Sequence, residues 1–235
     1  MNILAVDTSG PVAGVAVVRD GEIAYEGAAV NRLTHSVNLM PMIEEALNRA
    51  GVAVSDVDLY AAVTGPGSFT GVRIGVSAVK GMAHGAGKPC VGVDALEALA
   101  AGLCQADALI CPIQDARAGQ VYAAAFLPGM PPERLLPDMA EKLPVFLERA
   151  LEAAGARRLC FVGDGVKPFR AAIEQALGER AVFPPAHMRY LRPASVGLLA
   201  QAYQAQSVDY LTLMPMDLRA PQAERERARK LEGRA

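Results

Sequence analysis

The chain has 235 residues, of which 52% are hydrophobic and 20% charged, and its formal net charge is −2. A chain of this kind can bury a large core, in one long domain or in two smaller ones. The near-neutral charge, the lack of Trp and an aromatic content of 5% argue against a basic or base-stacking nucleic-acid surface. Every apolar stretch of about 18 residues contains charges or turn signals, so we expect no membrane span and a place in the cytosol.

The first part of the chain predicts three strands and a helix. The strands cover residues 2–7, 13–19 and 22–30, and the Asp20-Gly21 pair between the last two is a strong signal for a tight hairpin turn. Apolar residues then recur at helical spacing over residues 36–50. This segment therefore predicts a meander followed by an amphipathic helix.

A strand, a glycine-rich turn and a second helix follow in one uninterrupted run. The apolar residues 59–63 end at Gly65-Pro66-Gly67, which predicts a strand buried on both faces. Ser68 or Thr70 is the expected N-cap of the helix, because each side-chain oxygen can accept a hydrogen bond from an amide of the first turn. The turn also allows a phosphate site at the helix N-terminus, although it lacks the Lys-Ser or Lys-Thr of a P-loop.

The helix after this turn carries an unusual set of small residues. Gly71, Gly75 and Ala78 lie on one stripe, although each interior glycine costs about 1 kcal/mol relative to alanine. Apolar residues cover nearly every other direction, so we predict a helix without a fully solvated side. We interpret the stripe as the contact for a second helix, either internal or from a partner chain; a helix buried wholly within one domain is the alternative.

The remaining segments repeat this organisation. A strand at 89–93 and a helix at 95–103 complete the first half, and a second cycle then begins, which predicts an α/β protein of two lobes with a cleft between them. We place an N-terminal lobe at residues 1–105, a smaller C-terminal lobe at 106–221 and a charged flexible tail at 222–235, and the last helix is free to pack back on the first lobe. The second cycle consists of strands 109–114 and 120–126, a Pro-rich link at 128–137, a helix at 140–154, a strand at 159–162 and helices at 168–177 and 195–206.

Few residues suggest catalysis or metal binding. The cysteines, Cys90, Cys104, Cys111 and Cys160, lie singly in apolar surroundings, which is typical of reduced buried thiols. No pair of histidines has metal-ligand spacing, and no Gly-x-Ser-x-Gly elbow is present. We therefore assign no catalytic residue and no metal ligand.

Nucleotide binding is the chemistry that the pattern leaves open. Asp7, followed by Thr8 and Ser9, ends the first strand of one lobe, and Asp115 ends the first strand of the other. Carboxylates that face each other across a cleft hold Mg²⁺ on a nucleotide, and a glycine turn such as that at Gly163 lets phosphates approach the backbone. The alternative is that both aspartates only hydrogen-bond their own turns.

Four segments together resemble the TsaB (YeaZ) family of bacterial tRNA threonylcarbamoyladenosine biosynthesis proteins. They are Asp7-Thr-Ser9, residues 35–43, Thr64-Gly-Pro-Gly-Ser-Phe-Thr-Gly-Val-Arg-Ile-Gly75 and Asp115-Ala-Arg-Ala-Gly-Gln-Val-Tyr122. The resemblance spans residues 1 to about 126, and Pro215-Met-Asp-Leu-Arg219 departs from the family pattern. It implies a two-lobed actin-like ATPase (ribonuclease H-like) fold, shared with sugar kinases and heat-shock ATPases.

The resemblance also implies a non-catalytic relative of the transferase TsaD. Where TsaD has a metal-binding His-x-x-x-His, this chain has Ala95 and Leu99, whose side chains cannot coordinate a metal. The implied role is that of an accessory subunit that forms a heterodimer with TsaD, is joined by the ATPase TsaE and contacts tRNA through the complex. That complex transfers threonylcarbamoyl to N6 of adenosine 37 in tRNAs that read codons beginning with A.

In this family the two N-terminal helices form the interface with TsaD, and members alone form homodimers through the same surface. The resemblance implies no cofactor for the chain itself and allows ATP or ADP at the complex interface, with Asp7, Thr8, Ser9, Asp115 and Gly163 as a vestigial nucleotide site. The residues that map onto the interface helices are Leu39, Met40, Ile43, Leu47, Gly71, Val72, Gly75, Val76, Ala78, Val79 and Met82.

Two enzyme classes remain as alternatives. A phosphotransferase of the acetate-kinase kind would use Asp7 and Asp115 around Mg-ATP, and ATP turnover by the purified chain would reveal it. A metallopeptidase, the activity once attached to this superfamily, would contain stoichiometric zinc or iron. Both assays separate an enzyme from an accessory subunit.

Overall fold

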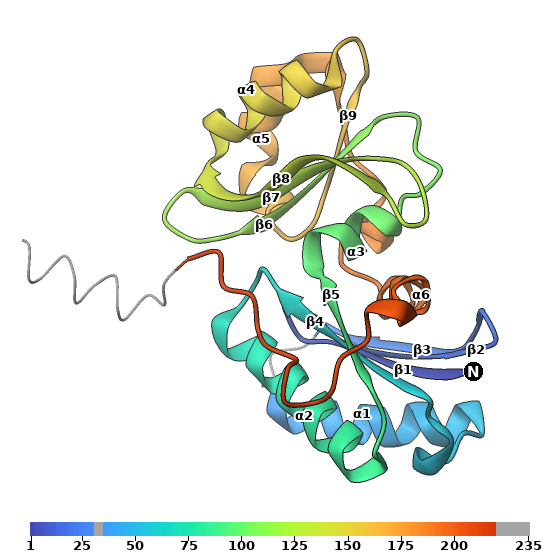
Figure 1. Ribbon diagram of the computed structural model, residues 1–235. Helices are drawn as coiled ribbons and strands as arrows, with labels where there is room; N and C mark the ends of the chain where they lie inside the picture. Colours follow the sequence, from blue (N-terminus) through green and yellow to red (C-terminus); the bar gives the residue numbers. More distant parts are fainter. Residues whose placement is uncertain (31–34, 220–235) are drawn as a thin grey trace, which may run out of the picture.

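The computed structural model describes residues 1–30 and 35–219 and shows two sheets of five strands each (Figure 1). The first sheet has the order β3-β2-β1-β4-β5, and the second has the corresponding order β8-β7-β6-β9-β10. In each sheet an antiparallel meander of three strands is extended by parallel strands. The two-lobed α/β fold predicted from the repeated pattern is therefore confirmed. The strands are β1 Asn2–Asp7, β2 Ala13–Arg19, β3 Glu22–Ala29, β4 Leu59–Gly65, β5 Cys90–Asp94, β6 Leu109–Asp115, β7 Gln120–Leu127, β8 Glu133–Lys142, β9 Leu159–Val162 and β10 Ala181–Val182.

Helices cover both faces of each sheet. Figure 1 shows α1 and α2 on the outer face of the first sheet, α4 and α5 on the outer face of the second, and α3 and α6 between the lobes. The α-helices are α1 His35–Ala50, α2 Phe69–Ala86, α3 Ala95–Ala101, α4 Leu143–Ala154, α5 Val166–Leu177 and α6 Pro193–Ala202. Short 3₁₀ helices lie at Val54–Asp56, Gly178–Arg180, Ala186–Met188 and Gln204–Gln206.

One hydrophobic cluster joins the two lobes. It contains Ile3 and Ala5 from β1, Leu96 and Leu99 from α3, and Phe126 from β7, all with at most 4% of their surface exposed. Alternate residues of β1 point to the other face, where Leu4 and Val6 pack against α1 and α2. α3 contacts β4 and β5 of the first sheet and β6 and β7 of the second, whereas α6 packs on the first sheet. Because α3 is shared by both sheets, it fixes the position of one lobe relative to the other.

The hairpin and capping signals act as expected. Asp20 and Gly21 both have positive φ, 51° and 88°, as a tight turn between β2 and β3 requires. Ser68 is the N-cap of α2, and its Oγ accepts a hydrogen bond from the Gly71 amide at 3.2 Å. At the other end Gly87 adopts φ 62° and closes the helix.

The expected Pro-rich link at 128–137 is wrong in its second half, because residues 133–137 belong to β8. β8 is an edge strand. In its pairing with β7, Ala123 lies opposite Met139 and Ala125 lies opposite Leu136, so β8 has one more residue than β7 between these two pairs. Pro137 lies in this irregularity, where a residue without an N–H is tolerated. For the same reason the helix expected from residue 140 begins only at Leu143.

The end of the described chain returns to the first lobe. The helix expected at 195–206 is α6 followed by a 3₁₀ turn, and α6 contacts β1 and β2. Residues 203–219, which we call the C-terminal strap, then run along β5, α2 and the end of β4. Val208 bridges Cys90 of β5, Lys80 of α2 donates to the Leu213 carbonyl oxygen at 2.9 Å, and the Met216 amide donates to the Thr64 carbonyl oxygen of β4 at 2.7 Å. The tail predicted at 222–235 lies outside the described residues.

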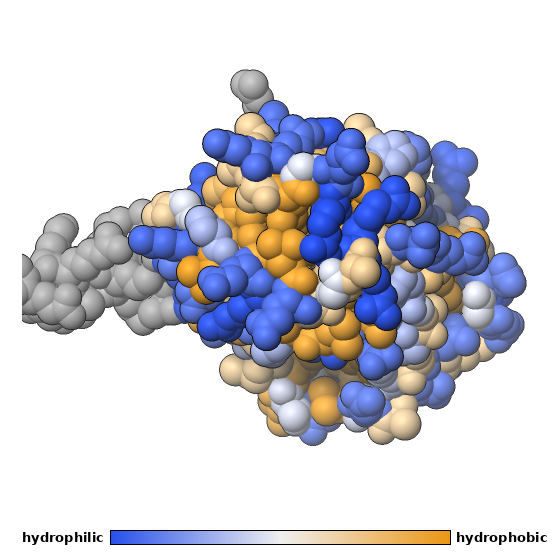
Figure 2. Space-filling view, turned by 90° about the horizontal axis from the view of Figure 1, so that it is seen from above, coloured by the Kyte–Doolittle hydropathy of each residue, from blue (hydrophilic) through white to orange (hydrophobic). Residues whose placement is uncertain are grey.

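Exposed apolar side chains are spread over several elements. Seen from the side of the second lobe, hydrophilic side chains surround patches of hydrophobic ones (Figure 2). On the first lobe, Val37, Met40 and Val54 are exposed on or beside α1, and Leu211 and Met214 on the strap. No helix in the described ranges combines the length and apolar content that a bilayer span needs.

Candidate functional site between the lobes

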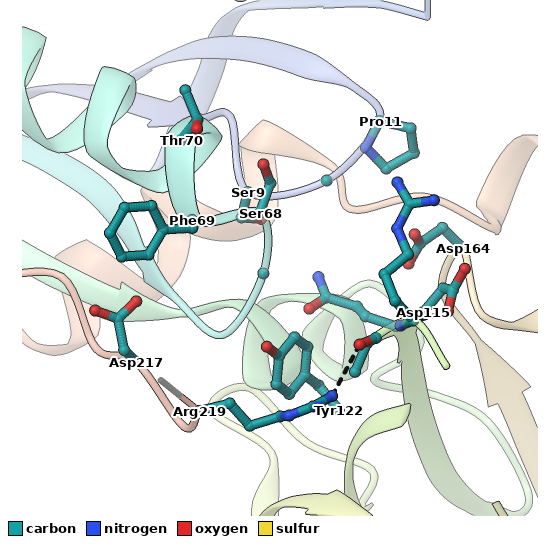
Figure 3. A pocket seen from close by; sticks show the side chains of 15 residues that line it. Ser9, Pro11, Ser68, Phe69, Thr70, Asp115, Tyr122, Asp164, Asp217 and Arg219 are labelled. Carbon is teal, nitrogen blue, oxygen red and sulfur yellow. Dashed lines mark hydrogen bonds between the residues drawn. The ribbon is translucent and has the colours of Figure 1, made fainter. Parts of the chain in front are cut away.

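An open cleft of about 420 Å³ lies between the lobes, where loops from both sheets meet (Figure 3). Parallel strands β1 and β4 of the first sheet, and β6 and β9 of the second, turn their carboxyl ends toward it. In open α/β sheets this is the usual position of a ligand. The lining residues are Ser9, Gly10, Pro11, Gly67, Ser68, Phe69, Thr70, Gln114, Asp115, Ala116, Arg117, Tyr122, Asp164, Asp217 and Arg219.

Three aspartates come together at the ends of these strands. Asp7 ends β1, Asp115 ends β6 at the equivalent place of the second sheet, and Asp164 follows β9, the parallel neighbour of β6. Burial is the main cause that raises the pKa of Asp164, and repulsion from Asp115 adds to it. The floor of the cleft is therefore acidic.

Asp7 is the most enclosed of the three. Only 2% of its surface is exposed, and its Oδ1 accepts hydrogen bonds from the Ser9 amide at 2.8 Å and the Ser9 hydroxyl at 2.7 Å. Burial raises the pKa of Asp7 to about 6; repulsion from Asp164 acts in the same direction, and the Ser9 hydrogen bonds and His35 act against it. The ionised form of Asp7 therefore makes the folded state less stable than its protonated form does.

Three other residues of the expected nucleotide site make contacts within the fold. Thr8 donates its hydroxyl hydrogen to the Gly71 carbonyl oxygen at 2.7 Å, and Asp115 accepts a hydrogen bond from the Arg117 amide at 2.8 Å. Gly163 has φ 111°, and a Cβ there would lie 2.1 Å from the Ile113 carbonyl oxygen. The chain thus uses these groups to hold β1 against α2 and β9 against β6.

The mouth of the cleft is built from α2 and the strap. The Arg73 guanidinium lies over the Phe69 ring at 3.4 Å and forms a salt bridge with Asp217 at 2.6 Å. Arg219 reaches across the cleft and donates to the Ala116 carbonyl oxygen at 2.8 Å, as the dashed line in Figure 3 shows. The strap therefore links the first lobe to the turn after β6.

Several lining residues were not singled out as site residues by the sequence, among them Gln114, Asp164, Asp217 and Arg219. Asp217 and Arg219 lie in the segment that departs from the family pattern, and Asp164 lies in a turn noted only for its glycines. Gln114 precedes Asp115 on β6 and has no signal that distinguishes it from an ordinary strand residue. A site between two lobes is assembled by tertiary packing, so local patterns identified only its strand-end aspartates, Ser9 and the turn before α2.

The structure changes the interpretation of the glycine stripe on α2. A Cβ at Gly71 would lie 2.2 Å from the Thr8 carbonyl oxygen, and one at Gly75 would lie 2.5 Å from Thr8 Oγ1. Both glycines therefore face the chain's own β1, and their assignment to a partner contact is wrong. The expectation of a helix without a solvated side is also wrong, because Ser77 and Gly81 are exposed.

Most of the other predicted interface residues are part of the core of the first lobe. Each has at most 4% of its surface exposed and packs on the outer face of the first sheet, although Ile43 and Leu47 also line a surface groove: Leu39, Ile43, Leu47, Val72, Val76 and Val79. Met40, with 50% exposed, and the half-buried Ala78 and Met82 remain accessible.

An apolar groove of about 460 Å³ lies beside these accessible residues. It is formed by α1, the start of the following 3₁₀ helix and Met82 of α2, with Met40 and Val54 among its exposed walls. Glu44 and Asn48 supply polar atoms at the rim. An apolar centre with a polar rim is typical of a protein–protein contact.

Ala95 and Leu99 occupy the positions at which the resemblance implies metal ligands in TsaD. Both are buried in the cluster that joins the lobes. In the part of the chain that the structure describes, no three His, Cys, Asp or Glu side chains are arranged to hold a metal ion. The four cysteines are free thiols.

Comparison with known proteins identifies the family. Residues 29–223 match the family model "TsaD: tRNA N6-adenosine threonylcarbamoyltransferase". The tRNA threonylcarbamoyladenosine biosynthesis protein TsaB of Bacillus subtilis is 35% identical over 226 residues, which cover 95% of this chain and 96% of that protein. The chain belongs to the TsaB family. The TsaB protein of Escherichia coli is 36% identical over 54% of this chain and 55% of its own length.

Solved structures agree with membership of the TsaB family. YeaZ from Pseudomonas aeruginosa superposes with a TM-score of 0.75 at 25% identity and covers 92% of this chain and 98% of its own. The (R)-2-hydroxyglutaryl-CoA dehydratase component A of Acidaminococcus fermentans shares the fold alone, with a TM-score of 0.52 at 13% identity over 87% of this chain and 99% of its own. The two-lobed actin-like fold is thereby established.

Proposed function

We propose that this chain is the non-catalytic scaffold and activator subunit of the bacterial complex that forms N6-threonylcarbamoyladenosine at position 37 of tRNA. The observation that carries the proposal is the near full-length similarity to a protein named for this modification. The match to the transferase model supports it further, because a chain with the frame of the enzyme can pack against the enzyme itself. We expect the chain to act in the cytoplasm.

The residues at positions 95 and 99 support a non-catalytic role. A methyl and an isobutyl group supply no lone pair to a metal, and both side chains are buried in the apolar cluster that joins the lobes. The carboxylates of the cleft floor repel phosphate groups, so we propose that this chain requires no nucleotide. ATP or ADP would then bind at the complex interface, where TsaE joins.

The apolar groove beside α1 is the proposed contact for TsaD, and for a second copy of this chain when TsaD is absent. Met40 and Met82 give it flexible apolar side chains that adapt to a partner surface, and Val54 adds apolar area. The large buried residues of α1 and α2 support these helices from beneath. The contact therefore depends on the few exposed apolar side chains rather than on the glycine stripe.

Reconstitution of the modification is the test of function. Purified TsaD, TsaE, threonylcarbamoyl-adenylate and a tRNA reading a codon that begins with A are combined with and without this chain, and modified adenosine is measured by mass spectrometry. We expect modification only when the chain is present. Equal modification in its absence would overturn the proposal, as would ATP turnover or stoichiometric zinc or iron in the chain alone.

Substitutions in the groove test the interface. Met40→Glu combined with Met82→Glu places two charges on the apolar surface, and we expect loss of the heterodimer in size-exclusion chromatography with an unchanged monomer fold. Met130→Glu is the matched control, because Met130 is 43% exposed but lies on the second lobe. A heterodimer that survives the double substitution would place the contact elsewhere.

A further inference from the structure

A small pit opens beneath the cleft and is separate from the proposed partner surface. Its volume is about 10 Å³, the space of a single water-sized group. Asp7, Gln114 and Asp164 line it together with the apolar Leu99 and Leu191. Ser9, Gly10 and Pro11 border both the pit and the cleft, so a group in the pit connects directly to the larger space above.

Gln114 has a buried acceptor with no partner. Only 6% of the residue is exposed, and its Oε1 accepts no hydrogen bond. A buried carbonyl oxygen without a donor is rare in folded proteins because it has lost its hydration. Since Gln114 lines both the pit and the cleft, a donor that enters the pit would satisfy it.

The pit also contains two carboxylates that have no salt-bridge partner in the described part of the chain. Asp7 and Asp164 are close enough for Asp164 to raise the pKa of Asp7, and neither forms a salt bridge among residues 1–30 and 35–219. His35 is the nearby basic group that lowers the pKa of Asp7, and its Nε2 lies 2.9 Å from the Gly10 carbonyl oxygen. The pit thus combines two carboxylates and one amide oxygen.

We propose that the pit binds the primary ammonium group of an alkylamine, supplied by a small molecule or by a lysine side chain. An ammonium group carries a positive charge and three N–H donors, which match Asp7, Asp164 and the Gln114 oxygen. The pit has room for one group of the size of –NH₃⁺, but it is too small for a trimethylammonium or a guanidinium group. The alkyl stem passes Pro11 into the cleft, where the rest of the ligand lies.

Titration of the full-length chain in an amine-free buffer tests the site. Butylamine, butyltrimethylammonium and butanol are added in turn to ¹⁵N-labelled protein, and the amide signals of Gly163, Gly165 and the Gln114 side chain are followed by NMR. We expect saturable shifts with butylamine and at least about tenfold weaker binding of the other two. Equal response to all three compounds, no saturable response to butylamine, or displacement of butylamine by equimolar potassium would overturn the proposal.

Variants separate binding from folding. Gln114→Leu removes the unpartnered oxygen, so we expect at least about tenfold weaker butylamine binding together with an unchanged or higher melting temperature. Gln201→Leu is the matched control, because Gln201 also has a buried Oε1 without a partner but lies on α6, outside the pit. Unchanged binding by Gln114→Leu, or equal loss in the control, would contradict the proposal.

A second comparison identifies the source of the ammonium group. A lysine-containing tripeptide and its Nε-acetylated form are titrated beside free spermidine in the same assay. Tighter binding of spermidine indicates a small amine, tighter binding of the lysine peptide indicates a protein side chain, and binding of the acetylated peptide as tight as that of the unmodified one overturns the proposal. These measurements use the isolated chain, so their outcome is independent of the role proposed in tRNA modification.

Discussion

Thr8 Oγ1 occupies the space that a side chain at position 75 would need, because a Cβ built on Gly75 would lie 2.5 Å from it. The same hydroxyl donates to the Gly71 carbonyl oxygen, so it is fixed in place. Close approach of α2 to the end of β1 therefore requires glycine at position 75. This contact positions the loop after β1, which forms one side of the cleft.

We expect Gly75→Ala to destabilise the protein by about 1–3 kcal/mol, because the contact with Thr8 outweighs the gain in helix propensity of about 1 kcal/mol. Thr8→Ala removes the obstructing oxygen and leaves Val6 at 3.4 Å, an ordinary contact. Urea denaturation of both single variants and the double variant measures the coupling. The double variant should be more stable than the sum of the single effects predicts, by about 1 kcal/mol or more; strict additivity would contradict the assigned contact.

Gly81 on the same helix should behave in the opposite way. It is exposed, and a Cβ there would have nothing within 4 Å. We expect Gly81→Ala to raise the free energy of unfolding by about 0.5–1 kcal/mol through helix propensity and a less flexible unfolded chain. Gly87→Ala serves as the comparison: φ is 62° at this position, so the substitution should lower the free energy of unfolding. A destabilising effect of Gly81→Ala would show that position 81 has a contact not seen here.

Asp7 should make stability depend on pH in a defined direction. Its folded pKa of about 6 lies above its ordinary value of 3.8, so the protonated form favours folding and this contribution is lost as the pH rises from about 4 through 6. Two pKa units correspond to about 3 kcal/mol. The unfolding free energy of Asp7→Asn relative to that of the wild type should therefore rise by up to about that amount between pH 4 and pH 7. Urea denaturation of both proteins at each pH measures this difference. A constant difference between the two proteins would show that the pKa of Asp7 is not raised.

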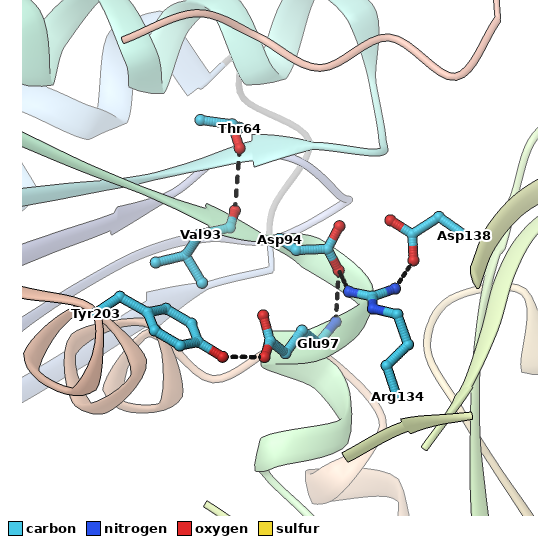
Figure 4. Close-up of polar contacts among 7 residues, drawn as sticks. All are labelled: Thr64, Val93, Asp94, Glu97, Arg134, Asp138 and Tyr203. Carbon is cyan, nitrogen blue, oxygen red and sulfur yellow. Dashed lines mark hydrogen bonds and ion pairs between the residues drawn. The ribbon is translucent and has the colours of Figure 1, made fainter. Parts of the chain in front are cut away.

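Arg134 should be important for the contact between the lobes. It extends from β8 to Asp94, at 3.3 Å, and to Asp138, whose side chains are only 13% and 12% exposed (Figure 4). Its guanidinium also lies 4.5 Å from the centre of the Phe126 ring. Arg134→Met leaves two enclosed carboxylates without a cation, and we expect a loss of about 2–4 kcal/mol in unfolding free energy at pH 7.

The control for Arg134 is the ion pair between Arg170 and Glu174, which are half exposed on α5. Arg170→Met should change the unfolding free energy by less than about 1 kcal/mol, as is typical of surface pairs. Because burial raises the pKa of Asp94, the effect of Arg134→Met should shrink in acid as that carboxyl group protonates. Equal effects of the two substitutions at pH 7 would argue against a special role for the contact between the lobes.

Local sequence signals determined much of the fold. The Asp20-Gly21 turn signal correctly separated β2 from β3, and Ser68, one of the two expected residues, is the N-cap of α2. Composition was misleading at β8, where prolines suggested a link although an irregular edge strand tolerates them. A proline excludes a ladder hydrogen bond but does not reveal whether that position of the strand needs one.

Except for β8 and β10, the sequence by itself determined the order of strands and helices. It also determined the positions of Asp7 and Asp115 at strand ends and the family to which the chain belongs, because these depend on neighbours along the chain. Only the tertiary structure decided that Gly75 faces Thr8 rather than a partner, and that Gln114 and Asp164 join Asp7 around one pit. A helix presents several faces with similar composition, and the face that becomes buried depends on packing against residues far away in sequence. For the same reason, a site built by both lobes exists only once their sheets are placed against each other.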